Sequence, residues 1–341
     1  MSKRATMVDI ALRAGVSQAT VSLVLNEVAN ARVSADTRAR VKAIAAELGY
    51  SRKGSLARVS GVPLIGLLID EVTTTPFATQ LIEGARDAAA AQGCLLAVFC
   101  SGGDSTIEQA VLDLLAASGA AGVLYATLIT RAVTPPDRLR DLPAILLNCH
   151  DPRRQYPTVL PGDVTGGIGA TDALIRAGHR RIGHITGEDW GEAARDRAQG
   201  YRRALTTADI AFDPDLMVGP AWTVDSGRAM TLRLLDLPDP PTAIFCFNDR
   251  AAIGCYEALQ LRGLRVPQDV SVVGFDNEDF VANLLPPLST MVLPHDEMAR
   301  VAVGHLLDLR DAPGPYPHPR RIKIDCSFVQ RQSISTPPAC V

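Results

Sequence analysis

Residues 5–26 decide the fold of the N-terminal part of the chain, and they read ATMVDIALRAGVSQATVSLVLN. Apolar residues recur at helical spacing on both sides of Gly15, as they do on one face of an amphipathic helix. Thr6 and Ser17 stand where each helix needs an N-cap, and Gly15 tolerates the positive φ of a tight turn. The pattern predicts two helices, over residues 8–14 and about 18–26, joined as a helix-turn-helix.

A third helix is predicted over residues 34–48, with Ser34 as its N-cap and Asp36 near the positive end of the helix dipole. Val41 and Leu48 would face the other two helices. Spacing alone also fits a small helical bundle with no role in DNA binding. The distribution of charge favours the DNA-binding interpretation.

The formal net charge of −3 is a sum over two unlike parts of the 341-residue chain. Residues 1–60 hold ten Lys or Arg against four Asp or Glu, a net charge of +6. The remainder holds 24 basic and 33 acidic residues, a net charge of −9. A basic module on an acidic body indicates a polyanionic partner for the module alone.

Composition narrows the class of protein. A hydrophobic fraction of 47% excludes a disordered chain, and the length predicts two or three domains. The longest apolar stretches reach about half a membrane span, and no apolar signal segment follows the N-terminus, so a cytoplasmic protein is expected. The seven cysteines are scattered without C-x-x-C spacing, which favours buried reduced thiols over disulfides or a zinc site.

From residue 63 onward, short apolar segments alternate with amphipathic ones. Continuous apolar strands between helices predict parallel sheets that are covered on both faces. Two such doubly wound lobes bind ligands at the carboxyl ends of their strands, which here means the cleft between the lobes.

Residues 5–26 resemble the headpiece signature of the LacI/GalR family of transcriptional repressors, and VSADTRARV at 33–41 and ELGY at 47–50 continue the resemblance. It implies an all-α helix-turn-helix headpiece followed by an α/β periplasmic-binding-protein-like core of two doubly wound parallel-sheet lobes. The domains expected are the headpiece over 1–50, a hinge over 51–62, a first lobe over 63–161 plus 294–322, and a second lobe over 162–293 plus 323–341. The chain would cross between the lobes near 160–163, 288–294 and 321–325.

The resemblance also implies which headpiece residues contact DNA. Hydroxyl and amide side chains would hold phosphates, while Gln18 would pair with adenine and Ala19 and Leu23 would touch thymine methyl groups. Many family members carry Arg at the position of Leu23, so a different base is expected there. The complete predicted set is Thr6, Ser17, Gln18, Ala19, Thr20, Ser22, Leu23, Asn26 and Val59.

The hinge would form a helix only on DNA and insert an apolar side chain into the minor groove. Counting from Tyr50 places that side chain at Val59, with Leu56 as the alternative. Gly54 lowers helix propensity by about 1 kcal/mol relative to Ala, so hinge folding would depend on DNA. A plain flexible linker is the other interpretation.

Candidate ligand-binding residues stand mainly at strand ends. The family's R-x-x-G-[FY] motif matches at Arg197, and its ligand carboxylate matches at Asp276. Arginine, carboxylate and amide groups beside a tryptophan suit the hydroxyl groups and flat face of a sugar. The alternatives are an interlobe salt bridge between Arg197 and Asp276, and a core role for Trp222. The full predicted set is Phe77, Asn148, Arg197, Trp222, Asn248 and Asp276.

Enzyme motifs are weak. Gly167 begins a G-x-G without the third glycine of a dinucleotide fingerprint. The six histidines lack metal spacing, so helix-end or surface roles are expected, and His179 matches a structural turn of the family. Asp163 is expected as an exposed carboxylate that caps the next helix. No cofactor, metal or catalytic residue is predicted.

The resulting prediction is a homodimeric repressor of sugar uptake or catabolism genes. Two headpieces would bind a pseudo-palindromic operator, and a small sugar effector would release them. A sugar is favoured over a purine, in part because only one aromatic residue is placed opposite Phe77. A purine- or nucleoside-responsive regulator of the same family is an alternative, and a solute-binding protein of a transporter is the rival class.

Overall fold

The computed structural model describes residues 6–25, 33–48, 61–72, 77–311 and 320–338. They divide into two compact units whose boundary in the chain falls between Val62 and Pro63.

The N-terminal unit contains the three predicted helices, α1 (Met7–Ala14), α2 (Gln18–Leu25) and α3 (Ala35–Glu47). Thr6 caps α1 in a capping box with Asp9, and Gly15 ends the helix at φ 65°. The hydroxyl oxygens of Ser17 and Ser34 accept hydrogen bonds from the backbone N–H groups three residues later. The helices share one small core, which is why such short helices are stable together. Its buried members are Ile10, Ala11, Ala14, Val21, Val24, Val41 and Ala45.

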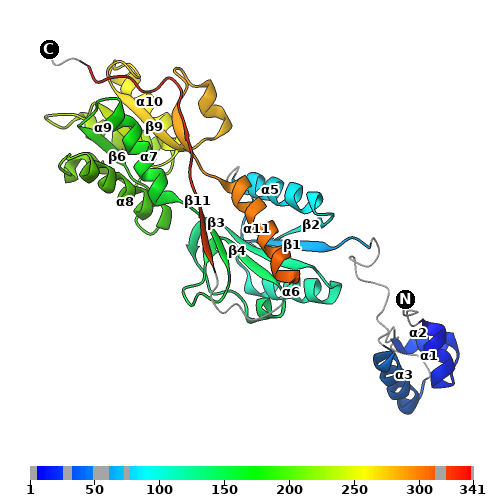
Figure 1. Cartoon of the computed structure of the whole chain (residues 1–341). Helices are drawn as coiled ribbons and strands as arrows, with labels where there is room; N and C mark the ends of the chain where they lie inside the picture. Colours follow the sequence, from blue (N-terminus) through cyan, green and yellow to red (C-terminus); the bar gives the residue numbers. More distant parts are fainter. Residues whose placement is uncertain (1–5, 26–32, 49–60, 73–76, 312–319, 339–341) are drawn as a thin grey trace. The chain divides into compact units, whose positions relative to one another are not determined.

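The first lobe is built on a six-stranded parallel sheet with the order β11-β5-β4-β3-β1-β2 (Figure 1). Its strands are β1 (Leu64–Ile69), β2 (Leu95–Cys100), β3 (Gly122–Ala132), β4 (Ala144–His150), β5 (Thr158–Pro161) and β11 (Arg321–Ile324). Its helices are α5 (Phe77–Ala91), α6 (Ser105–Ser118), the 3-10 helix η1 (Asp137–Asp141) and α11 (His295–Asp311).

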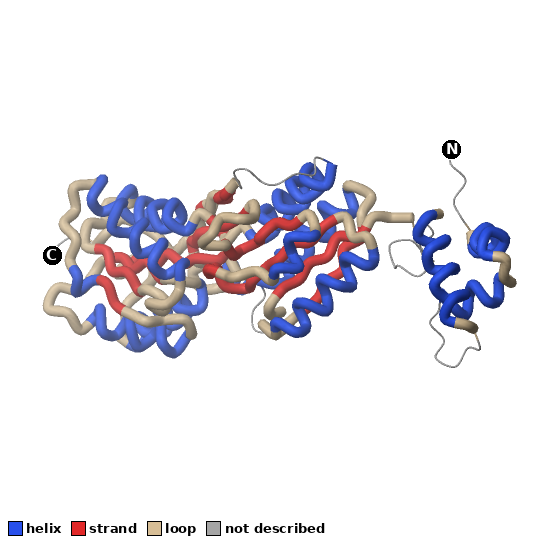
Figure 2. Tube along the Cα trace, turned by 90° about the horizontal axis from the view of Figure 1, so that it is seen from below, coloured by secondary structure: helices blue, strands red, loops and turns tan. Residues whose placement is uncertain are grey.

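Two glycines show that helices cover both faces of this sheet. Gly66 on β1 lies against Leu115 of α6, and Gly122 on β3 lies against Leu306 of α11. Gly66 is paired in register with Val123, the neighbour of Gly122, so the two glycines point to opposite faces. The layers of helix, sheet and helix are visible in Figure 2.

The second lobe has a sheet with the order β12-β10-β9-β8-β6-β7. Its strands are β6 (Ile182–Ile185), β7 (Met217–Val218), β8 (Ala243–Cys246), β9 (Ser271–Asp276), β10 (Ser289–Val292) and β12 (Phe328–Val329). Its helices are α7 (Asp163–Arg176), α8 (Glu192–Thr207), α9 (Val224–Leu235), α10 (Asp249–Leu261) and the 3-10 helices η2 (Pro214–Leu216) and η3 (Asp279–Asn283). The sheet is parallel except at one edge, where β12 returns antiparallel to β10.

The chain passes between the sheets at three places, between Pro161 and Asp163, between Val292 and His295, and between Ile324 and Phe328. The boundary predicted between 322 and 323 is wrong, since it cuts β11, whose residues up to Ile324 pair with β5. Because of this backbone pairing, the first lobe extends to Ile324, two residues beyond the predicted boundary.

Glycines let the helices of the second lobe cross closely. A Cβ atom at Gly167 of α7 would overlap the backbone of Arg197 in α8, and one at Gly200 of α8 would overlap the backbone of α7. The G-x-G at Gly167 thus lies inside a helix and serves helix packing, where the absence of a side chain permits close backbone approach.

Five of the six described cysteines are buried and Cys100 is exposed, while Cys340 lies outside the described residues; the described ones are all free thiols. No single described helix is long and apolar enough to cross a membrane; α1 and α2, bent at 106° to one another, pass that test only as a pair.

Candidate ligand-binding cavity and DNA-binding headpiece

A cavity is lined by residues of both lobes. All six residues predicted to bind ligand line it, namely Phe77, Asn148, Arg197, Trp222, Asn248 and Asp276. The other lining residues lie outside the predicted set, and they are Leu128, Ile129, Thr130, Glu188, Trp190, Gly191, Ala193, Ala194, Phe247, Leu293 and His295.

Arg197 is the centre of a buried polar cluster in the second lobe, with 3% of its side chain exposed. Its Nε donates to Asp163 Oδ1 at 2.8 Å, and its Nη1 donates to the carbonyl oxygen of Phe247 at 2.6 Å. Nη1 also lies 3.6 Å from Asp276 Oδ1, and the guanidinium carbon stacks 3.5 Å from the ring centre of Phe275. These contacts hold the guanidinium plane in one orientation at the cavity wall.

Two sequence expectations about this cluster are wrong. Asp163 is buried rather than exposed, because its carboxylate pairs with Arg197. The contact between Arg197 and Asp276 joins α8 to β9 within one lobe, so it is not an interlobe salt bridge. Burial opposes the charge of Arg197, but the carboxylates of Asp163 and Asp276 outweigh it and raise the guanidinium pKa.

Asp276 ends β9 in a strained backbone conformation, with φ 112°. Such a conformation is costly for a non-glycine residue and is typical of functional sites. Burial raises the pKa of Asp276 well above its usual value, and the charge of Arg197 offsets this only in part. The side chain is therefore a desolvated carboxyl group that can exchange hydrogen bonds with a bound molecule.

Aromatic residues form much of the apolar wall. Trp222 and Phe247 lie with ring centres 5.5 Å apart at an angle of 44°, and Trp190 adds a residue that is 62% exposed. With Phe77, four aromatic residues line the cavity. The sequence-based reason for favouring a sugar, a single aromatic opposite Phe77, is therefore wrong. A usable signal was present, because Trp190 is one of only two tryptophans in the chain.

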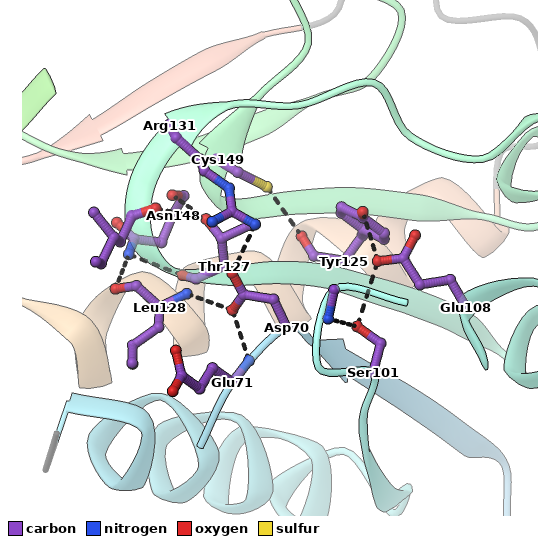
Figure 3. A network of polar contacts seen from close by, with 12 residues as sticks. Asp70, Glu71, Ser101, Glu108, Tyr125, Thr127, Leu128, Arg131, Asn148 and Cys149 are labelled. Carbon is purple, nitrogen blue, oxygen red and sulfur yellow. Dashed lines mark hydrogen bonds and ion pairs between the residues drawn. The ribbon is translucent and has the colours of Figure 1, made fainter. Parts of the chain in front are cut away.

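The two asparagines are largely committed to the protein itself. Asn148 donates from Nδ2 to the carbonyl oxygens of Thr127 and Leu128 at 3.0 Å each (Figure 3). Its Oδ1 accepts from the hydroxyl group of Thr130 at 2.7 Å. Asn248 caps α10 and donates to the carbonyl oxygen of Trp222 at 3.1 Å. Each amide thus shapes the cavity wall, and the donors of Asn148 are both occupied by backbone.

The first-lobe wall is further fixed by Asp70 at the end of β1 (Figure 3). Its Oδ1 accepts from the backbone N–H of Glu71 and of Leu128, both at 2.8 Å. Its Oδ2 lies 2.9 Å from Nη2 of Arg131. These bonds hold the irregular part of β3, whose pairing with β4 shifts register between Ala126 and Arg131.

Three histidines, His179, His184 and His295, are buried, and of these only His184, inside β6, departs from the predicted helix-end, surface or structural-turn roles. His179 forms hydrogen bonds with the hydroxyl groups of Thr242 and Ser271 and with the carbonyl oxygen of Ser335, which fits its predicted structural role. His184 stacks between Tyr201 and Phe245. Burial lowers the pKa of His184 to about 4. These rings are packing elements of the second lobe.

His295 differs because it lines the cavity from the first lobe with 1% of the residue exposed. Its ring meets Phe77 edge-on at 5.6 Å, and its Nδ1 has no hydrogen-bond partner among the described residues. Burial and then the charge of Arg197 lower the pKa of His295 to about 3, so the ring is neutral.

A polar contact joins the two lobes beside the cavity. The carboxylate of Glu192, at the start of α8, lies 2.9 Å and 3.0 Å from Nε2 of His150 at the end of β4. The same carboxylate accepts from the backbone N–H of Ala132 at 3.1 Å. This interlobe clasp, formed by Glu192, His150 and Ala132, connects the carboxyl ends of β3 and β4 to the second lobe.

The predicted DNA-binding residues that are described lie at the N-cap of α1, in the turn before α2 and on α2 itself. Gln18, Ala19 and Leu23 are exposed, whereas Val21 and Val24 of the same helix are buried. The oxygens of Thr6 and Ser17 accept backbone hydrogen bonds as helix caps. The side of α2 that faces away from the headpiece core therefore carries the polar Gln18 together with the apolar Ala19 and Leu23. Asn26, Val59 and the alternative Leu56 lie outside the described residues.

No group of three or more His, Cys, Asp or Glu side chains that could hold a metal ion occurs within the described ranges.

Two family models match the sequence, the lacI family of bacterial regulatory proteins over residues 6–53 and a periplasmic binding protein-like domain over residues 171–334. The ribose operon repressor of Haemophilus influenzae is 35% identical over 97% of this chain and 98% of that protein. The HTH-type transcriptional repressor CytR of Escherichia coli is 33% identical over 98% of this chain and 97% of that protein. Among solved structures, the Lac repressor dimer bound to operator and the anti-inducer ONPF has a TM-score of 0.66 at 26% identity, over 98% of this chain and 100% of that chain.

These matched proteins are transcriptional repressors rather than enzymes, and the predicted fold class is confirmed by the two models and by the sheets. A relative of 35% identity spans nearly the whole chain. The chain belongs to the LacI family of DNA-binding transcriptional regulators.

Proposed function

We propose that this regulator represses genes of sugar uptake or catabolism and leaves its operator when a small sugar occupies the cavity. The observation that carries the proposal is the buried arrangement of Arg197 and Asp276 beside Trp222. A guanidinium and a carboxyl group suit vicinal hydroxyls, and an indole face suits the C–H groups of a sugar ring. The relative named a ribose operon repressor supports this class of effector.

The headpiece would supply operator binding. The exposed Gln18, Ala19 and Leu23 would face base edges, with Gln18 paired to adenine. Polar side chains would position the helix on phosphates, and an apolar hinge residue would enter the minor groove. The residues proposed to contact phosphates are Thr6, Ser17, Thr20, Ser22 and Asn26, and the proposed hinge residue is Val59.

A homodimer would match a pseudo-palindromic operator. The first lobe offers a face for a second copy, since β2 is the last strand of its sheet. Leu95 and Val98 on β2 and Ile107 and Leu114 on α6 are exposed apolar residues. The similar Lac repressor structure is named a dimer, which supports a second copy of this chain as the partner on this face.

Operator binding is tested by fluorescence anisotropy with the DNA upstream of the protein's own gene. The affinity should fall steeply with salt, because phosphate contacts release counterions. Gln18→Ala should weaken binding by roughly tenfold or more, the value of one bidentate base contact. Leu12→Ala, at an exposed α1 residue outside the predicted set, is the matched control. Binding that is absent or insensitive to salt contradicts the proposal.

The effector is tested by thermal unfolding with ribose, lactose and adenosine. A sugar should raise the melting temperature and release the operator, since binding to the folded state alone stabilises it. Trp222→Ala should lose both effects. This variant is preferable to Arg197→Ala, because Arg197 is buried against two carboxylates and its loss would also destabilise the fold. Stabilisation by adenosine and by no sugar would overturn the sugar assignment.

A further inference from the structure

The charged groups around the cavity leave its wall negative. Besides His295, the ionisable lining residues in the described part of the chain are Glu188, Arg197 and Asp276. The charge of Arg197 is already matched by Asp163 at 2.8 Å. Glu188 alone then leaves the lining negative, whether or not the buried Asp276 carries its proton.

The helix ends at the cavity also disfavour anions. Helix N-termini commonly bind phosphate through their free N–H groups and dipole. Here α8 begins with Glu192 and α10 begins with Asp249, and the amide oxygen of Asn248 already accepts the N–H of Ala251 at 2.8 Å. At α8 the negative charge of Glu192 disfavours an anion, and at α10 the amide oxygen of Asn248 already occupies one position that a phosphate or carboxylate would need.

His295 provides a neutral polar group on the opposite wall. A neutral imidazole offers one donor and one acceptor, and the buried Nδ1 lacks a partner among the described residues. An unpaired buried polar atom is costly unless a bound molecule pairs with it. The first lobe otherwise lines the cavity with apolar residues and with Thr130 and Asn148, which bond to one another at 2.7 Å.

Resting on the proposed function, we propose that the cavity selects an uncharged polyol and rejects its phosphorylated or carboxylate-bearing counterparts, with His295 as a specificity-determining residue that hydrogen-bonds a ligand hydroxyl. Glu188 repels anions from the second lobe, and His295 contributes hydrogen bonding from the first lobe without adding a positive charge.

The charge selection is tested with matched probes on the full chain. Ribose is compared with ribose 5-phosphate, glucose with glucose 6-phosphate, and adenosine with its 5′-monophosphate, by thermal shift and calorimetric titration. The uncharged member of a pair should bind at least about tenfold more tightly than its anion. Equal or tighter binding of the anion overturns the proposal.

The role of His295 is tested with two substitutions. His295→Phe keeps a ring against Phe77 but removes both nitrogens, so it should weaken the uncharged ligand by about tenfold, the value of one buried hydrogen bond. His295→Gln restores a donor and an acceptor and should recover part of the affinity. His305→Phe, at a more exposed histidine of the same helix, is the matched control. Wild-type affinity in His295→Phe overturns the assignment.

Operator binding separates this inference from the proposed function. If an anionic probe releases the operator, the regulator stands and the charge selection fails. If the chain does not bind its upstream DNA, the proposed function fails, while the preference between matched probes is still read from the thermal shifts.

Discussion

The two lobes contribute different chemistry to the cavity that they share. The second lobe supplies Glu188, Arg197, Asp276 and both tryptophans, whereas the first lobe supplies neutral residues such as Phe77 and Asn148. Arg197 and its carboxylate partners lie within the second lobe, so this ion-pair cluster does not depend on the first.

Because the lobes differ in this way, substitutions in one lobe should affect folding stability, and substitutions in the other should affect mainly ligand binding. Changes at the charged wall of the second lobe should alter folding as well as binding, because they leave buried charges without partners. Changes at the neutral wall or at the interlobe clasp should alter binding with little effect on folding.

The largest effect is expected from Arg197→Met. It leaves Asp163 and Asp276 buried without a cation and should lower the free energy of unfolding by about 3–5 kcal/mol. Urea unfolding followed by circular dichroism measures the loss. The matched change in the first lobe is Arg131→Met, which removes a half-exposed ion pair with Asp70 and should cost about 1 kcal/mol or less. Equal losses would abolish the contrast between the lobes.

The buried His184 should give the second lobe an acid-sensitive contribution. Its pKa falls from 6.5 to about 4 on folding, because burial disfavours the charged ring. A lowered folded-state pKa means stability that is present above pH 6.5 and is lost as the pH falls through about 4, about 3 kcal/mol in all.

Unfolding of the wild type and of His184→Phe from pH 7 to pH 4 isolates this contribution. The pKa of Asp249, raised by burial to about 7, acts in the opposite direction, since it favours the folded state as the pH falls towards 3.8. Because both proteins contain Asp249, the difference between their unfolding free energies should shrink as the pH falls. A difference that is independent of pH would contradict the prediction.

A smaller effect is expected at the helix crossing of the second lobe. Gly200→Ala places a methyl group against the backbone of α7 and should cost about 1–3 kcal/mol in thermal unfolding. Gly304→Ala on α11 of the first lobe meets no atom within 4 Å and should stabilise by up to about 1 kcal/mol. If Gly200→Ala also stabilises, close backbone contact is not what holds α7 against α8.

The smallest effect is expected at the interlobe clasp. Glu192→Gln weakens the contact with His150 across the lobes and should reduce affinity for the uncharged ligand a few-fold, as for a partly exposed ion pair of about 0.2–1 kcal/mol. Calorimetric titration measures it. Glu257→Gln breaks an ion pair with Arg228 inside the second lobe and should leave ligand affinity unchanged. Equal effects of the two variants on ligand affinity would contradict a role of the interlobe clasp in ligand binding.

The positions of the cavity residues followed from the sequence because local rules place them. Asn148 lies in the last part of β4, Asn248 follows β8 and Asp276 ends β9, so all three lie near strand ends. Parallel strands bring their carboxyl ends to one edge of the sheet. The three headpiece helices and their caps followed from spacing and from Thr6, Gly15 and Ser17 in the same way.

The partners of these residues were decided by the tertiary structure. Asp163 and Arg197 are 34 positions apart, and they meet because Gly167 and Gly200 let α7 and α8 cross closely. Trp190, His295 and Glu192 carry no strand-end or motif signal, so their places at the cavity depend on how loops and lobes pack. Helical periodicity, helix caps and the succession of strands and helices along the chain depend on residues close together in the sequence, so they can be predicted from it. Hydrogen bonds and ion pairs between distant residues form only between groups that packing has brought together.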